Sequence, residues 1–261
     1  MEAARPVTSE FRALHEGEPF VIPNPWDVGS ARMLEELGFK ALATTSSGFA
    51  FTLGRADGDV TLDEVIAHTA ALAEAVWIPV AVDLENGYGR AAADAARAVS
   101  AAADAGAAGG SIEDWDRVDG LYPSEEAAER IAAAAEAASA TGFMLAARAE
   151  NLIRGNPDLD DTIARLQAYE AAGADVLYAP GIHSDDQIRA VCSAVGKPVN
   201  VLAFPGMKAA EIFAAGAQRI SVGGQLMWVA AAAAAEAAIA LRDTGDFAAL
   251  KARLQGADWL R

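Results

Sequence analysis

Hydrophobic residues along the chain follow two alternating patterns. Short apolar runs, typical of buried strands, are each followed by a longer segment in which apolar residues recur at helical spacing. The pattern predicts strands at residues 19–23, 41–45, 78–83, 110–113, 143–147, 175–178, 198–202 and 219–222. It predicts helices at residues 8–15, 30–37, 90–105, 124–140, 158–172, 184–194, 208–215, 226–241 and 246–255. A further helix is predicted to begin at residue 61, after a loop at 46–60.

Strands that alternate with helices form parallel sheets with helical crossovers. Eight such units in 261 residues favour closure into a (β/α)8 barrel of the TIM type, which typically needs about 250 residues, over an open sheet. No linker marks a second domain. We therefore predict one α/β barrel domain over residues 1–261, with 226–261 as a C-terminal helical extension.

The segment at 226–241 is apolar except for Glu236 and rich in Ala. It is shorter than the ~20 residues that a membrane span needs. We expect a helix that is buried on nearly all sides, packed against the barrel or against another subunit.

Two acids mark the end of the third predicted strand. We expect Asp83 and Glu85 to project together, because residues two apart on a strand share a face. Adjacent carboxylates repel one another unless a cation or a shared proton lies between them. Since Asn86 and Gly87 then begin a turn, the pair indicates half of a hard-cation site. The alternative is a polar strand end that caps the next helix.

More acids follow the neighbouring strands, at the end of the barrel where active sites lie. Asp57, Glu113 and Asp114 join Asp83 and Glu85 there. The group contains no His or Cys, and oxygen ligands favour Mg²⁺ or Mn²⁺ over zinc.

Other candidates at this edge are not acidic. Arg148 could clamp a carboxylate or phosphate, or form a structural ion pair with Glu150. Ser47 and Gly48 could offer backbone N–H groups to a ligand, or simply form a turn. Asn200, at the seventh strand, is a further candidate for binding a substrate.

The composition of the chain limits the kinds of molecule that it is expected to bind. The chain has 37 acidic and 20 basic residues, a net charge of −17. This charge argues against nucleic acid and against an anionic membrane surface, since both favour a basic face. The single cysteine, Cys192, allows no intrachain disulfide, and residues 1–10 show no apolar leader, so we expect a cytoplasmic protein.

Several segments, in this order, resemble the isocitrate lyase/phosphoenolpyruvate mutase superfamily. They are WDVGSA at 26–31, TSSG at 45–48, DLENGYG at 83–89, IED at 112–114, ARAE at 147–150 and RISVGG at 219–224. The family's acid-x-acid-Thr-Gly-Tyr-Gly run is present with Glu85 as the second acid and Asn86 in place of Thr. The resemblance covers about Asn24 to Gly224 and rests on the combination of segments.

The resemblance implies a Mg²⁺-dependent barrel that acts on small anionic α-oxo or enolpyruvyl acids. By this likeness, Asp83 binds the metal most directly, and Asp57, Glu85 and Glu113 hold its waters. We take Arg148, Glu113 and Asp57 as candidate catalytic residues.

The resemblance also implies which residues contact the substrate. Ser47, Gly48 and Phe49 contact the substrate carboxylate and oxo group, and Arg148 binds the far anionic group. The family's last barrel helix is typically exchanged between subunits. This agrees with the apolar helix at 226–241 and implies a homo-oligomer, a dimer or tetramer.

The sequence departs from the family in two loops. The C–C lyase branch carries a Lys-Lys/Arg-Cys-Gly-His motif after the fourth strand, where this chain reads DWDRVDGLY at 114–122. Without the Cys, cleavage of isocitrate or methylisocitrate by the usual route is disfavoured. The mutase branch has an Asn in this loop and a His after the sixth strand, where this chain reads YAPG at 178–181. The subfamily stays open.

We therefore predict a Mg²⁺-dependent lyase or phosphonomutase-type enzyme that forms a metal-stabilised pyruvate enolate. Positive charge beside the oxo oxygen stabilises the charge that develops there, and C–C cleavage, decarboxylation and P–C chemistry all fit. One alternative is a metal-independent barrel enzyme that binds a phosphorylated substrate at Gly223 and Gly224. Another is a catalytically silent family member.

Overall fold

The computed structural model describes residues 7–251. The eight predicted strands form one sheet in the order β1-β10-β9-β8-β7-β4-β3-β2, and neighbouring strands are parallel. Their bounds are β1 Phe20–Ile22, β2 Leu42–Ala43, β3 Val80–Asp83, β4 Gly109–Glu113, β7 Met144–Arg148, β8 Val176–Tyr178, β9 Val199–Leu202 and β10 Arg219–Ser221.

Hydrogen bonds join the two outer strands of this sheet. The N–H of Ala43 donates to the carbonyl of Pro23 at 3.1 Å, and the Asn24 side-chain amide donates to the carbonyl of Thr44 at 3.1 Å. The sheet is thereby a nearly closed barrel, which confirms the predicted (β/α)8 architecture.

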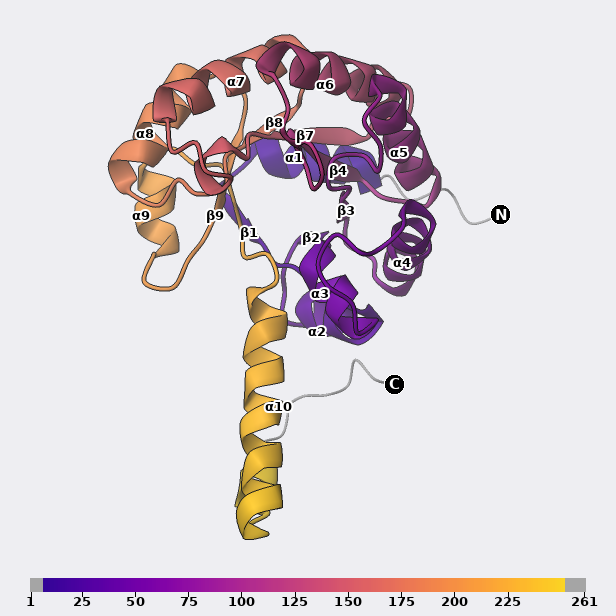
Figure 1. Cartoon of the computed structure of the whole chain (residues 1–261), viewed down its shortest axis with the longest axis vertical. Coiled ribbons are helices and arrows are strands. Elements are labelled where there is room, and N and C mark those ends of the chain that lie inside the picture. The colour runs from indigo at the N-terminus through magenta and orange to yellow at the C-terminus, as the bar shows by residue number, and fades with distance from the viewer. Residues whose placement is uncertain (1–6, 252–261) are drawn as a thin grey trace.

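Helices surround the barrel as a ring that is open between α9 and α2, where α10 leaves it (Figure 1). Their bounds are α1 Val7–Glu16, α2 Val28–Glu36, α3 Ser46–Thr52, α4 Leu62–Ala75, α5 Ala92–Asp104, α6 Ser124–Ser139, α7 Leu159–Ala171, α8 Asp185–Ala194, α9 Ala209–Ala214 and α10 Gln225–Thr244, with 3-10 turns η1 Asn151–Ile153 and η2 Ala248–Lys251. The predicted capping box at the start of α4 is present, since Thr61 and Glu64 bond each other's backbone N–H.

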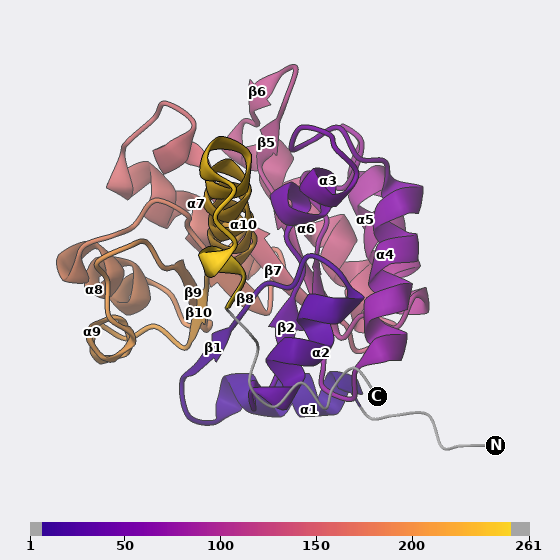
Figure 2. The same ribbon diagram turned by 90° about the horizontal axis from the view of Figure 1, so that it is seen from below.

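The two ends of the barrel differ in what covers them (Figure 2). We call the carboxyl ends of the strands the mouth. There a small antiparallel hairpin, β5 Trp115–Asp116 and β6 Gly120–Leu121, rises from the loop after β4. We call the opposite end the floor. It is covered by α1, whose His15 ring meets the ring of Phe20, the first residue of β1, edge to face at 5.2 Å.

The region at 46–60, predicted as a loop, contains α3. The Thr45 side chain caps this helix by accepting from the N–H of Gly48. Two serines and a glycine at the start of a short segment hide the helical pattern, so the prediction was wrong here. The helix sets Ser46 and Ser47 at the mouth.

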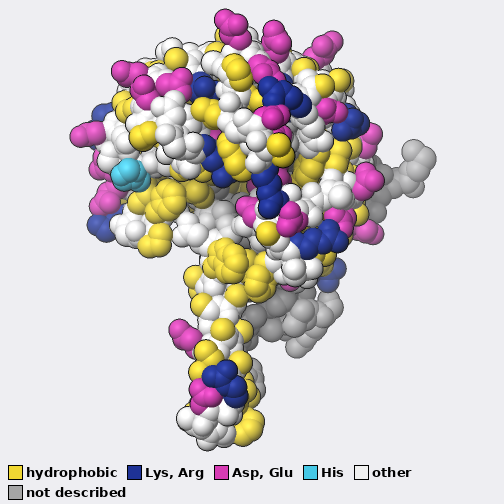
Figure 3. Space-filling model, in the orientation of Figure 1, with side chains coloured by type: hydrophobic (Ala, Val, Ile, Leu, Met, Phe, Trp, Pro, Cys, Tyr) yellow, Lys and Arg dark blue, Asp and Glu magenta, His cyan; other side chains and the backbone are white. Residues whose placement is uncertain are grey.

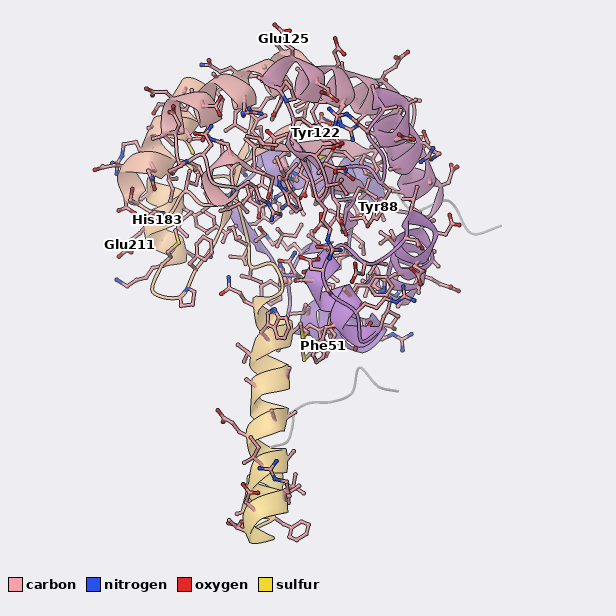
Figure 4. All side chains as sticks on the ribbon, viewed as in Figure 1. Phe51, Tyr88, Tyr122, Glu125, His183 and Glu211 are labelled. Atoms are coloured by element: carbon pink, nitrogen blue, oxygen red, sulfur yellow. The ribbon has the colours of Figure 1, made fainter. Side chains whose placement is uncertain are left out.

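The apolar helix α10 also departs from the prediction. It projects away from the barrel (Figure 1), and 6% of its most apolar window is buried. Only its base packs on the barrel, where Phe51 meets Trp228 edge to face at 5.4 Å (Figure 4). Packing of the whole helix against the barrel is therefore wrong, and packing against another subunit stays a prediction.

Hydrophobic side chains gather at the base of α10 and recur along it (Figure 3). Val229 and Ile239 are among its exposed apolar residues. By length and composition α10 could cross a membrane, and one such helix is weak evidence for that. Of the helix predicted at 246–255, the turn η2 is seen, and residues 252–255 lie outside the described residues.

Candidate active site

Asp83 lies at the centre of the mouth, at the end of β3. Its backbone N–H donates to the Thr44 hydroxyl at 2.9 Å, and its carboxylate accepts from the N–H of Ser46 at 3.4 Å. Both contacts come from residues that follow the neighbouring strand β2, so the position of Asp83 depends on the barrel and not on a flexible loop.

Arg148, at the end of β7, lies among three carboxylates. Its guanidinium is 3.1 Å from Asp83, 3.0 Å from Glu113 and 2.7 Å from Glu150, and it lies over the ring of Tyr178. Burial opposes its charge, but the three carboxylates raise its pKa well above the ordinary value. The ion pair with Glu150 that the sequence offered as an alternative is present, and it is part of a larger network.

The acids at the mouth hold more negative charge than Arg148 balances. Burial raises the pKa of Glu85 to about 7, helped by the charges of Asp83 and Asp57. Burial also raises the pKa of Asp57 and, despite Arg148, raises that of Glu113 well above its usual range. A further cation at this place would stabilise all of these carboxylates.

The acids are not arranged as a ready-made metal cage. Among residues 7–251, no three His, Cys, Asp or Glu side chains surround one point closely enough to coordinate an ion, and Arg148 bridges Asp83 and Glu113. The donor set is all oxygen and suits a hard cation. Metal binding would require Arg148 to release at least one of these acids.

The turn after β3 explains how Glu85 reaches the mouth. The strand ends at Asp83, so the two acids do not share a strand face as predicted. Instead Glu85 and Tyr88 both have left-handed backbone, with φ of 46° and 59°. The Tyr88 hydroxyl donates to the Glu85 carboxylate at 3.4 Å, and Tyr88 points toward the mouth (Figure 4). The turn re-aims the second acid toward the first.

Two cavities meet at the mouth. The inner cavity, of about 250 Å³, descends into the barrel, and its lining includes Asp83, Arg148, Tyr178, Asn200, Ser221 and Arg219. The outer cavity, of about 540 Å³, lies beneath the β5–β6 hairpin, and its lining includes Glu85, Tyr88, Glu113, Trp115 and Asp116. Ser46, Asp57, Arg148 and Arg154 line both.

The predicted substrate-binding residues divide into two groups. Ser47 lines the inner cavity. Gly48 instead packs inward, since a Cβ there would lie 2.6 Å from the Thr45 side chain and 3.1 Å from that of Trp26. The N–H of Phe49 donates to the carbonyl of Thr45 at 3.0 Å, and its ring stacks on His68. The structure brings Ser47 to the site and turns Gly48 and Phe49 toward the core.

Asp114, the fifth acid predicted at the mouth, points away from it. Its carboxylate accepts from Arg165 at 3.0 Å, from the Tyr169 hydroxyl at 2.5 Å and from the N–H of Glu150 at 2.7 Å. It is the residue after Glu113, so its side chain takes the opposite face of the strand. Asp114 thus holds the segment that carries Arg148 and Glu150.

One amide of the glycine pair after β10, that of Gly223, is already engaged. The N–H groups of Val222 and Gly223 both donate to the Asn24 side-chain oxygen at 2.9 Å. A Cβ at Gly224 would lie 2.4 Å from the Ser47 hydroxyl. This arrangement weighs against a phosphate-binding loop at Gly223 and Gly224.

Arg154 belongs to the site although sequence reasoning missed it. It follows η1, bonds Glu150 at 3.3 Å, and lies 3.5 Å above the ring of Trp115 in the hairpin. The sequence did contain a signal for it, because Arg154 lies in the loop that follows the strand ending at Arg148. Arg154 is less enclosed by acids than Arg148, so it is the cation at the mouth that is freer to meet an anionic ligand.

Comparison with known proteins identifies the family. The model of the phosphoenolpyruvate phosphomutase family matches residues 11–242. This chain belongs to the phosphoenolpyruvate mutase/isocitrate lyase superfamily. Its lyase and mutase relatives confirm that it is an enzyme of that general class.

Three relatives illustrate how similar this chain is to known proteins. A structure from Burkholderia cenocepacia, described as a candidate lyase or mutase, is 48% identical, with a TM-score of 0.94, over 98% of this chain and 96% of that one. An oxaloacetate decarboxylase from Rhodopseudomonas palustris is 34% identical over 81% of this chain and 75% of its own length. The structure of an oxaloacetate acetylhydrolase with its product oxalate is 29% identical, with a TM-score of 0.85, over 92% of this chain and 88% of that one.

Proposed function

We propose that this chain is a Mg²⁺-dependent enzyme that forms the enolate of a pyruvate-type oxo acid at the mouth of the barrel. The observation that carries the proposal is the group of acids Asp57, Asp83, Glu85 and Glu113 beside the two cavities, in which burial and the charge of Asp83 raise the pKa of the other three. Such a group gains stability from a cation, and carboxylates prefer Mg²⁺ or Mn²⁺.

In this proposal Asp83 holds the ion most directly, and Asp57, Glu85 and Glu113 hold its waters. When bound, the cation supplies positive charge beside the substrate's oxo oxygen. The Ser47 hydroxyl, at the cavity wall, donates to the substrate carboxylate. Arg148 is released from Asp83 and Glu113 and turns its donors toward the substrate, while Glu150 keeps it in place.

Among the reactions that pass through such an enolate, we favour decarboxylation of a β-oxo diacid. The bond to the departing carboxylate breaks, its electron pair forms the enolate, and CO₂ leaves. The enolate carbon then takes a proton, for which Glu113, with its raised pKa, and Asp57 are the candidate donors. Retro-aldol cleavage would also need a base for a hydroxyl proton. The loop at 114–123 contains no Cys or His for that task, and one relative is an oxaloacetate decarboxylase.

The test is a spectrophotometric assay of oxaloacetate loss and pyruvate release, with Mg²⁺ and with EDTA. The proposal predicts turnover above the spontaneous rate only with the metal. Equal turnover with EDTA would contradict the metal role. Metal-dependent oxalate binding without turnover on any oxo acid would point to a catalytically silent member.

We also propose that the chain is one barrel domain whose extension, from 226, packs on another copy in a cytoplasmic homo-oligomer. The support is the exposure of α10, with Trp228 52% and Val229 67% accessible. Val229→Asp with Ile239→Asp should lower the mass in sedimentation, whereas Glu236→Asp should leave it unchanged. An unchanged mass for the double variant would contradict this packing.

A further inference from the structure

Arg219 lies at the floor of the barrel, at the start of β10. Its Nε donates to the Asn200 side-chain oxygen at 2.8 Å, and its Nη1 lies 3.2 Å from Nε2 of His15 on α1. The residue is 7% exposed. Within residues 7–251, no carboxylate lies within ion-pair distance of its guanidinium.

Both partners of Arg219 are neutral. Burial and, after it, the charge of Arg219 lower the pKa of His15 to about 3. Nδ1 of His15 lies 2.8 Å from the carbonyl of Phe11. This contact places the ring proton on Nδ1 and leaves Nε2 to accept from Arg219.

The guanidinium is therefore a buried positive charge that no anion balances. Burial lowers its pKa, but only to about 10, so Arg219 is protonated at neutral pH. Uncompensated buried charges are costly, and proteins normally pair them. Arg148, in contrast, already has three carboxylates around it.

Arg219 is also a wall of the inner cavity. The barrel interior between mouth and floor carries small side chains, including Ala43, Ala81 and Ser111, and these leave the cavity of about 250 Å³ open from Asp83 down to Arg219. Asn200 and Ser221, bonded to each other at 2.9 Å, give the same wall a polar surface. The cavity thus connects the acids of the mouth to an unbalanced cation below them.

We propose that the inner cavity takes its ligand lengthwise, with the oxo-acid end at the mouth and a second anionic group, a carboxylate, on Arg219. This inference rests on the proposed function for the mouth end only. It makes the substrate a diacid, and it assigns the far anionic group to Arg219 in place of Arg148.

The test compares oxo acids of equal length that differ only in the far carboxylate. The pairs are 3,3-difluoro-oxaloacetate with 3,3-difluoro-2-oxobutyrate, 2-oxoglutarate with 2-oxovalerate, and 2-oxoadipate with 2-oxohexanoate. Each is titrated calorimetrically into the Mg²⁺-loaded protein, and oxalate reports on the mouth alone. The wild type should bind the diacid of at least one pair about 10- to 100-fold more tightly, the strength of a charge-assisted hydrogen bond.

Three variants locate that preference. Arg219→Gln keeps hydrogen-bonding groups without the charge and should erase the preference while oxalate binding stays as in the wild type. Arg219→Lys keeps the charge and should retain part of it. Arg12→Gln, the matched control, removes an arginine of α1 that pairs with Asp175 outside the cavity, and should change nothing.

The opposite results overturn the inference. If the wild type binds the monoacid and the diacid of every pair equally well, the inference is wrong. If Arg219→Gln prefers the diacid as strongly as the wild type does, Arg219 does not bind the far carboxylate and is only a structural anchor for α1. If wild-type protein with Mg²⁺ fails to bind oxalate, the proposed function fails instead. Acetate titrated into the metal-free protein then decides the Arg219 question alone. Binding that is lost in Arg219→Gln supports the anion subsite, and no binding overturns it.

Discussion

The mouth and the floor of this barrel are built from opposite imbalances of charge. At the mouth, acids from three strand ends outnumber the arginines that reach them, and burial raises the pKa of several. At the floor, a single arginine lies between a neutral histidine and an asparagine. Each end lacks the charge that a ligand could bring. This difference is the reason for proposing a cation at the mouth and an anion at the floor.

The two arginines make this comparison testable, because they respond differently to removal. Arg148 balances carboxylates that would otherwise repel one another, so the fold depends on it. Arg219 balances nothing, so the ligand-free fold gains little from its charge.

Arg148→Met should destabilise the ligand-free protein most, by about 3–5 kcal/mol, because it leaves buried carboxylates without their cation. Mg²⁺ should restore part of the loss if the same acids bind it. Chemical denaturation with and without Mg²⁺ measures both. A variant as stable as the wild type would show that the acids at the mouth do not need Arg148 to balance their charge.

Asp83→Asn should abolish most Mg²⁺-dependent turnover, with a loss of about 100- to 1,000-fold, because the acid nearest the proposed cation is neutralised without a change of shape. Steady-state kinetics and Mg²⁺ titration test this. Asp186→Asn, at a carboxylate that is 95% exposed, is the control and should behave as the wild type. Normal activity in Asp83→Asn would contradict the proposal that Asp83 holds a catalytic metal ion.

His15 makes stability depend on pH at the floor. Its pKa is about 3 in the folded protein, against an ordinary value of 6.5, so between these values the unfolded chain binds more protons. Stability should therefore rise with pH across this window, by up to about 1.4 kcal/mol per unit and about 2 kcal/mol between pH 5 and 7. His15→Gln should flatten that part of the profile.

The wild-type profile also contains His68, whose pKa burial lowers to about 4, so the difference between wild type and His15→Gln is the measured quantity. Denaturation midpoints at several pH values give it. Parallel profiles for the two proteins would mean that His15 is charged beside Arg219, which would contradict a floor with neutral partners.

Arg219→Met should change ligand-free stability least, by about 1 kcal/mol or less, because the lost hydrogen bonds are offset by removal of an unbalanced buried charge. Denaturation beside Arg148→Met provides the direct contrast. A loss as large as that of Arg148→Met would show that Arg219 is balanced in a way that the described residues do not reveal.

Much of the fold could be predicted from the sequence because each strand and helix has its own hydrophobic period. The strand ends then placed Asp83, Glu113 and Arg148 together, since all parallel strands end at one edge. The prediction of which side chains face the site was less accurate, because a shift of one residue along a strand or helix turns a side chain to another face. Asp114 follows Glu113 and faces the opposite side, and Gly48 and Phe49 turn inward once α3 forms.

Long-range contacts were beyond the sequence pattern. Arg219 and His15 are 204 residues apart, and each taken alone fits an unremarkable role in a strand or helix. The alternation of Arg219 and Ser221 along β10 was a signal that both face the barrel interior. The hydrophobic pattern alone could not separate a helix that leaves the barrel, as α10 does, from a helix buried in it, because both have the same apolar composition. Only the family resemblance pointed to a helix exchanged between subunits.

The proposed function depends on a cation-dependent oxo-acid site at the mouth. Calorimetric titration of oxalate, a mimic of the pyruvate enolate, with and without Mg²⁺ measures that dependence. We expect tight binding with Mg²⁺ and none detectable with EDTA. Binding of equal strength in both conditions, or in neither, would contradict it.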